Sequence, residues 1–189
     1  VAGGTTTINT AAMTTVGDQT YNDGVTVAAN TTLTSNAGGA ITFTGSVDSS
    51  NGNQTLTVKT AGVTTFNAPV GSGVGTALAS LTTDAPGSTT INTASVTAGA
   101  QTYNDPVRLD VTTTLASTTG GNITFNNTVD SFDGSQALTT STGGNTVFNK
   151  VVGGAQELAS LTTDTPGGTT INTTAIHSVG DQTYNNQVT

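Results

Sequence analysis

The chain repeats itself, and this constrains its fold more than any other feature. The string QTYND at 19–23 returns at 101–105, and it appears once more as QTYNN at 182–186. Repetition at a fixed period is typical of arrays in which each unit packs on the next. We therefore expect one continuous repeat array over residues 1–189, built from two copies of about 82 residues and part of a third: 3–86, 87–166 and 167–189.

A shorter pattern lies inside each copy. Many segments read Thr, large apolar residue, Asn, two variable residues and Val, as in TYNDGV at 20–25 and TFNNTV at 124–129. Successive segments are mostly 22–25 residues apart, and the residues within them alternate between apolar and polar. Alternation with a period of two predicts half-buried strands, and the Gly-Gly pairs between the segments predict turns.

Composition supports an all-β chain with a narrow core. Only 33% of the residues are hydrophobic and 4% aromatic, and only 7% are charged. Thr is the commonest residue, and its branched side chain favours extended backbone. Disordered chains usually combine low hydrophobicity with high charge, which this sequence does not do.

Two all-β architectures fit these observations. A parallel β-solenoid would use each stretch of 22–25 residues as one stacked coil. A row of immunoglobulin-like sandwiches of about 82 residues would match the long period, but such domains need a well-filled core and this chain has no Trp. We favour the solenoid. One observation is awkward for it: the step from Ile91 to Tyr103 is only 12 residues, which is about half a coil.

Charge and residue types exclude several classes of function. The net charge is −8, and the cationic side chains are Lys59, Arg108 and Lys150. Three scattered cations cannot neutralise a run of phosphates, so we expect no nucleic-acid partner. No apolar run is long enough to span a membrane, so we expect no membrane insertion in this segment. Absence of Cys removes disulfides and thiolate metal sites.

We expect neither a catalytic site nor a cofactor. The single histidine, His177, follows Ile176 at a position where the earlier copies have Thr14 and Thr97, which indicates a solvent-facing residue. Pairs such as Asp18 with Asp23, or Asp105 with Asp110, could act as general acid and base only inside a cleft, and in a repeat of such low charge they are interpreted as solvated turn residues. The change to Asn186 in the third copy is a further argument against a site that depends on charge. The chain is therefore predicted not to be an enzyme.

Calcium is the one metal for which the sequence offers candidates. The strings DSSNGN at 48–53 and DSFDGS at 130–135 occupy equivalent positions. Asp48, Asn51, Asp130 and Asp133 could supply oxygen ligands, of which Ca²⁺ takes six to eight. Neither string matches an EF-hand loop, and the simpler interpretation is a turn in which Asp or Asn caps its own backbone. No metal site is therefore assigned, and these four residues are kept as calcium candidates.

Threonine-rich strings raise a further alternative, a ligand-binding or ice-binding β-solenoid. TTTINT at 5–10 and TTLT at 31–34 have the character of an ordered hydroxyl array. Such strings do not recur in every unit of 22–25 residues, which weakens this interpretation.

The stretches at 3–35 and 87–117 carry a resemblance to a known family. Their repeated TTINT, QTYND and TTLTS-like strings resemble the repeats of filamentous-haemagglutinin-like, β-strand-repeat adhesins of bacterial surfaces. The resemblance covers essentially the whole chain and implies a secreted, elongated stalk or fibre at the bacterial cell surface. It supports adhesion or cell–cell contact as the function, with self-association into a filament as an alternative and an unidentified host or cell-surface ligand as partner.

The repeated motif is interpreted as a structural unit. We expect its ring, in Tyr21 and Tyr103 and in the phenylalanines at the same position, to fill the core. We expect the Asn that follows the ring to stack or to close a turn.

Overall fold

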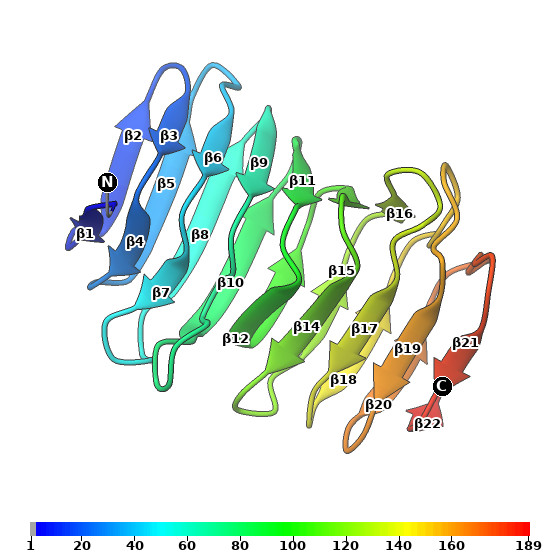
Figure 1. Cartoon of the computed structure of the whole chain (residues 1–189). Helices are drawn as coiled ribbons and strands as arrows, with labels where there is room; N and C mark the ends of the chain where they lie inside the picture. The colour runs from blue at the N-terminus through cyan, green and yellow to red at the C-terminus, as the bar shows by residue number, and fades with distance from the viewer. Residues whose placement is uncertain (1–2) are drawn as a thin grey trace.

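The computed structural model describes residues 3–189, and all the regular structure in them is β-strand (Figure 1). The 22 strands wind in about eight turns, and each coil lies on the one before it. Every strand pairing is parallel, from the first pair (β1 with β4) to the last (β20 with β22). The β-solenoid is therefore confirmed. Tandem immunoglobulin-like sandwiches are wrong, because their sheets would be antiparallel.

The coil has three faces, which we number in the order in which the chain visits them. Face 1 contains β1 (Thr5–Ile8), β4 (Gly24–Val27), β7 (Val47–Ser49), the bridge position Val70, the first half of β12 (Ser95–Tyr103), β14 (Thr113–Ser117), β17 (Leu138–Ser141), β19 (Leu161–Asp164) and β21 (Gln182–Tyr184). Face 2 contains β2 (Ala12–Thr15), β5 (Thr31–Ser35), β8 (Thr55–Thr60), β10 (Leu78–Asp84), the second half of β12, β15 (Ile123–Phe125), β18 (Asn145–Phe148), β20 (Gly168–Ile171) and β22 (Gln187–Val188). Face 3 contains β3 (Gln19–Tyr21), β6 (Ile41–Phe43), β9 (Val63–Phe66), β11 (Ser88–Ile91), β13 (Val107–Leu109), β16 (Val129–Ser131) and the bridge positions Val152 and Ile176.

The core is a narrow column enclosed by the three faces. Inward residues of successive coils are in register, so that Tyr21 pairs with Phe43 and Phe43 with Phe66. The predicted burial of the motif rings is confirmed, because Phe43, Phe66, Phe125 and Phe148 are at most 1% exposed and Tyr21 is 8% exposed. Leu, Ile and Val fill most of the remaining inward positions. A core this narrow needs few large side chains, which explains how a chain with only 33% hydrophobic residues can fold.

The short step between Ile91 and Tyr103 shifts the pattern by one face. Within the first copy the ring position returns to face 3 after each full coil. At the junction the chain leaves Ile91 on face 3, crosses face 1 with the first half of β12, and places Tyr103 on face 2. At the next junction Tyr184 comes to face 1. A copy thus contains three full turns and two faces of a fourth, and the step that is awkward for a solenoid is a regular part of it.

Strand β12 makes this shift without a loop, because it runs for nine residues and serves two faces. Its first part pairs with β14 and its last part with β10 and β15. Gly99 lies at the corner between the two parts, where an added Cβ would come within 2.4 Å of the carbonyl oxygen of Ala79. Only glycine allows so close an approach of two coils at this corner.

Candidate functional site: a groove on face 3

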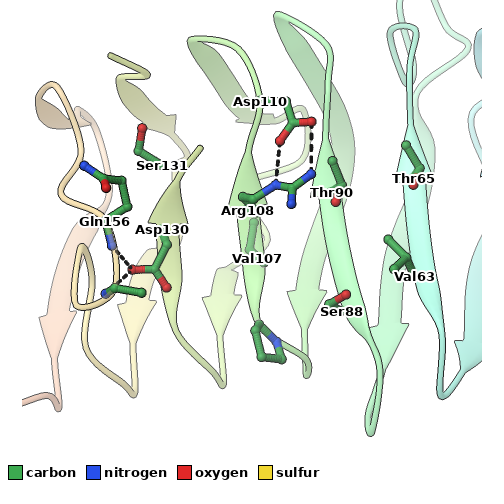
Figure 2. Close-up of a pocket in the computed structure, with 12 residues that line it drawn as sticks. Val63, Thr65, Ser88, Thr90, Val107, Arg108, Asp110, Asp130, Ser131 and Gln156 are labelled. Carbon is green, nitrogen blue, oxygen red and sulfur yellow. Dashed lines mark hydrogen bonds and ion pairs between the residues drawn. The ribbon is translucent and has the colours of Figure 1, made fainter. Parts of the chain in front are cut away.

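A groove of about 610 Å³ crosses the outer surface of face 3 (Figure 2). It runs over β9, β11, β13 and β16 toward the loop that contains Gln156, so it lies across the strands and along the axis of the solenoid. Val63 and Pro106 give it apolar walls. Hydroxyl, amide and charged groups of the same strands and loop complete it: Thr65, Ser88, Thr90, Arg108, Asp110, Asp130, Ser131 and Gln156.

Arg108 is the only cationic side chain that lines this groove. Its Nε donates to one carboxylate oxygen of Asp110 at 2.7 Å, and its Nη2 donates to the other at 3.2 Å. The guanidinium carbon lies 5.3 Å from the centre of the Phe132 ring, which is 59% exposed. An exposed ion pair of this kind contributes little to stability, about 0–1 kcal/mol. Its effect is to hold a planar donor group in a fixed orientation beside an exposed ring.

The first copy builds the same strands without these side chains. Thr26 stands where the second copy has Arg108, Ala28 where it has Asp110, and Ser50 where it has Phe132. The fold therefore does not require the Arg–Asp–Phe group, which we define as Arg108, Asp110 and Phe132. Our sequence interpretation missed this group, although a comparison of the two copies, position by position, carries the signal.

Of the calcium candidates, Asp48 and Asp130 hold the loop of the next coil. Oδ1 of Asp48 accepts from the backbone nitrogen of Ser72 at 3.1 Å and from Oγ1 of Thr76 at 2.9 Å. Oδ1 of Asp130 accepts from the backbone nitrogen of Ala155 at 2.8 Å. Each carboxylate thus accepts hydrogen bonds that attach the loop of one coil to the strand of the coil before it.

The other two candidates cap their own turns. Oδ1 of Asn51 accepts from the backbone nitrogen of Asn53 at 3.2 Å, and Oδ1 of Asp133 accepts from that of Ser135 at 3.1 Å. Hydrogen bonds from Ser135 and Gln136 lower the pKa of Asp133 below its usual value. These are turns in which Asn or Asp caps its own backbone, which is the simpler interpretation of the sequence.

The same two turns are closed by a serine and a glutamine. Oγ of Ser49 donates to Oε1 of Gln54 at 2.5 Å, and Ser131 donates to Gln136 in the same way. The glycine in each turn has a positive φ, 78° at Gly52 and 88° at Gly134. No group of three or more His, Cys, Asp or Glu side chains converges within residues 3–189. Calcium binding remains a prediction that a titration can test.

His177 is exposed, as predicted. Asp105 is not, and its interpretation as a solvated turn residue is wrong. Its side chain is 1% exposed and lies in a corner of the preceding coil, between the end of β10 and the beginning of β11. The sequence could not reveal this, because the two threonines that form the corner are 22 and 16 residues away along the chain.

Two buried hydroxyl groups hold Asp105 in that corner. Its Oδ1 accepts from Oγ1 of Thr83 at 2.9 Å and from Oγ1 of Thr89 at 2.8 Å. Its Oδ2 is buried without a hydrogen-bond partner. Burial raises the pKa of Asp105 above its usual value, and the hydrogen bonds from Thr89 and Thr83 offset part of that effect. Burial likewise raises the pKa of Tyr103, whose hydroxyl donates to Gln101 at 2.8 Å.

Threonines recur more regularly on the surface than the strings suggested. On face 2 a row of outward threonines crosses five successive coils in register: Thr32, Thr57, Thr82, Thr102 and Thr124. The row arises because the one-face shift places the ring motifs of the second copy beside the Leu-centred strands of the first. It is one residue wide, and Val147 interrupts it.

No helix in residues 3–189 is long and apolar enough to cross a membrane. Comparison with known proteins adds no relative: no family model, no curated protein and no solved structure matches this chain.

Proposed function

We propose that this chain is part of an elongated stalk or fibre on the outside of a bacterial cell, which supports adhesion or cell–cell contact. The observation that supports this is the continuity of the coil. The parallel strands and the core pass from the first copy into the second through β12, without a linker between the two copies. A unit that joins its neighbour in this way extends by copying.

Length is the property to measure. With strands about 4.8 Å apart, one copy of three turns and two faces adds about 18 Å to the rod. We expect electron microscopy of chains with increasing numbers of copies to show rods of constant width that lengthen by this amount per copy. Beads at regular spacing, or a length that does not grow in proportion, would contradict the proposal.

Location is tested separately. Antibodies raised against this chain should label intact source cells on their outer surface. Labelling that appears only after the cells are permeabilised would contradict the extracellular location, but it would not contradict the proposal that the chain forms a rod.

A second function, binding of a neutral saccharide, is supported by the groove on face 3. Sugar rings present pairs of hydroxyl groups and an apolar C–H surface. The groove offers the matching chemistry in its planar Arg108–Asp110 pair and the apolar walls of Val63 and Pro106, and the exposed ring of Phe132 lies against Arg108 beside it. Pockets with apolar walls and a few fixed polar groups are typical binding sites.

Two properties narrow the ligand class. The cation of Arg108 is neutralised by Asp110, and the whole chain carries a net charge of −8, so an acidic polysaccharide would be repelled. The groove crosses strands that are about 4.8 Å apart, which is close to the length of one sugar unit in an extended chain. We therefore expect a linear neutral glycan that lies along the rod axis.

The probes are hexasaccharides of β-1,4-linked glucose and of β-1,4-linked N-acetylglucosamine, with a hexasaccharide of galacturonic acid as the charged comparison. Arg108→Thr and Phe132→Ser install the residues that the first copy has, so the fold should be kept. We expect calorimetry to show binding of a neutral hexasaccharide that each variant weakens about tenfold, as for loss of about 1.4 kcal/mol.

Lys59→Ser is the matched control, since it removes a cation on face 2 and installs the residue that the second copy has there, Ser141. It should leave binding unchanged. No binding of either neutral probe at millimolar concentration, or equal binding by Arg108→Thr, would overturn the saccharide site.

A further inference from the structure

The corner that receives Asp105 occurs twice in the molecule, with a different side chain each time. The second corner lies at the next junction between copies, where Thr163 and Thr169 take the places of Thr83 and Thr89. There the inserted residue is Asn186. Its Oδ1 accepts from Thr169 at 2.7 Å and from Thr163 at 3.2 Å, so the amide oxygen does what Oδ1 of Asp105 does.

The other atom of the amide shows what this corner requires. Nδ2 of Asn186 donates to the main-chain carbonyl oxygen of Asp164 at 3.1 Å. Asp84 is the counterpart of Asp164 in the first corner, and Oδ2 of Asp105 is the counterpart of that nitrogen. A carboxylate oxygen cannot donate to a carbonyl, whereas a protonated carboxyl can. This accounts for the buried Oδ2 that has no partner.

We infer that the side chain of Asp105 is protonated and neutral in the folded chain, where it links the first copy to the second. The junction between these copies is destabilised when this proton is lost. The protonated carboxyl reproduces the Asn186 arrangement: one oxygen accepts from two threonines and the other donates toward the chain at Asp84. Loss of the proton leaves a buried negative charge whose Oδ2 has no hydrogen-bond donor.

The groups around the corner support the neutral form. Asp84, the last residue of β10, carries a charge that opposes ionisation of Asp105, although Nζ of Lys59 on β8 is ion-paired to Asp84 at 3.3 Å. Tyr103, on β12, supplies no cation, and β11 supplies only the Thr89 hydroxyl. Arg108, on β13, is on the outer face with Asp110 as its partner. Within residues 3–189, no cation is hydrogen-bonded or ion-paired to Asp105.

The direction of the pH effect follows. The pKa of Asp105 is raised in the folded chain, so the stability that this residue contributes is complete below its unfolded pKa, near 3.8, and is lost as the pH rises through its folded pKa. The other carboxylates titrate as well, so the effect must be measured as a difference between wild type and a variant.

Asp105→Asn copies the second corner into the first. We expect its melting temperature to exceed that of wild type by about 2–4 °C at pH 7.5, as for a gain of about 1 kcal/mol in a chain of this size. The difference should shrink steadily toward pH 3.5, where wild type carries the proton. Equal or lower stability of Asp105→Asn at pH 7.5, or a difference that does not depend on pH, would overturn the inference.

Two further measurements keep the result decisive. Asn186→Asp should introduce a pH-dependent loss at the second junction, smaller than that at the first because Asn186 is only half-buried. Carbon NMR of the carboxyl groups, assigned with Asp105→Asn, should show the Asp105 resonance titrating above pH 3.8. A titration midpoint at or below that value would contradict a proton-bearing Asp105.

Discussion

Asparagine side chains form a ladder along face 2. Each follows a ring or isoleucine of the repeated motif, and its amide nitrogen donates to the amide oxygen of the asparagine one coil earlier. The three distances, between Asn104, Asn126, Asn149 and Asn172, are 2.7, 2.7 and 2.8 Å. The predicted stacking of this residue is thus confirmed. A ladder of this kind satisfies in each coil a polar group that would otherwise compete with the strand pairing.

Asn126→Ala should therefore cost more than its exposure suggests. It removes two ladder hydrogen bonds and leaves groups of both Asn104 and Asn149 without partners, which we expect to cost about 1–3 kcal/mol. The measurement is the free energy of unfolding in urea. Asn67→Ala is the matched control, because Asn67 has one ladder bond, from Asn92, and Thr44 stands on its other side. Equal losses in the two variants would show that the second ladder hydrogen bond of Asn126 adds nothing.

At the scale of the strand, the rings make two separate stacks. Tyr21, Phe43 and Phe66 stack on face 3 with centroids 5.2 Å apart. Tyr103, Phe125 and Phe148 stack on face 2 with centroids 5.3 Å apart. The planes of neighbouring rings differ by at most 11°. Each stack ends where an isoleucine takes the ring position, immediately before the chain shifts by one face.

Phe125→Ala should be among the most damaging single changes. The ring is 1% exposed and lies between two others, so its loss leaves a cavity with aromatic walls above and below. We expect a loss of about 3–5 kcal/mol, and a smaller one for Phe125→Leu. Val74→Ala, at a fully exposed position, is the control and should change the urea midpoint little. A small loss in Phe125→Ala would mean that the coil closes around the gap.

Strands and coils could be predicted from the sequence, because alternation and copying are local signals. Tyr103, Val107 and Leu109 alternate with their neighbours along the chain, and their side chains are buried as expected. The burial of the Asp105 side chain could not be predicted. The change to Asn186 indicated that the acid was dispensable, whereas in the structure both side chains fill the same kind of corner. Which threonines form that corner depends on how the coils stack, and no local pattern contains this information.

At the scale of the whole molecule, contacts are between neighbours. Each coil packs on the coil before it and the coil after it, so a defect should be felt over a short distance. In Phe125→Ala we expect hydrogen exchange to accelerate in β15 and in its partners β12 and β18. Exchange in β5 and β8 should be nearly unchanged. Uniform acceleration along the chain would indicate one cooperative unit in place of a row of coils.

The one-face shift at each junction gives the rod a directional property. Because a copy ends two faces into its fourth turn, every group that it carries is turned by one third of a revolution relative to the same group in the copy before. Tyr21, Tyr103 and Tyr184 already point to the axis from three different sides. In a longer array of such copies, any outward group repeated in each copy would be displayed to all sides in turn. A fibre of this kind has no preferred side, and could meet a surface from any azimuth.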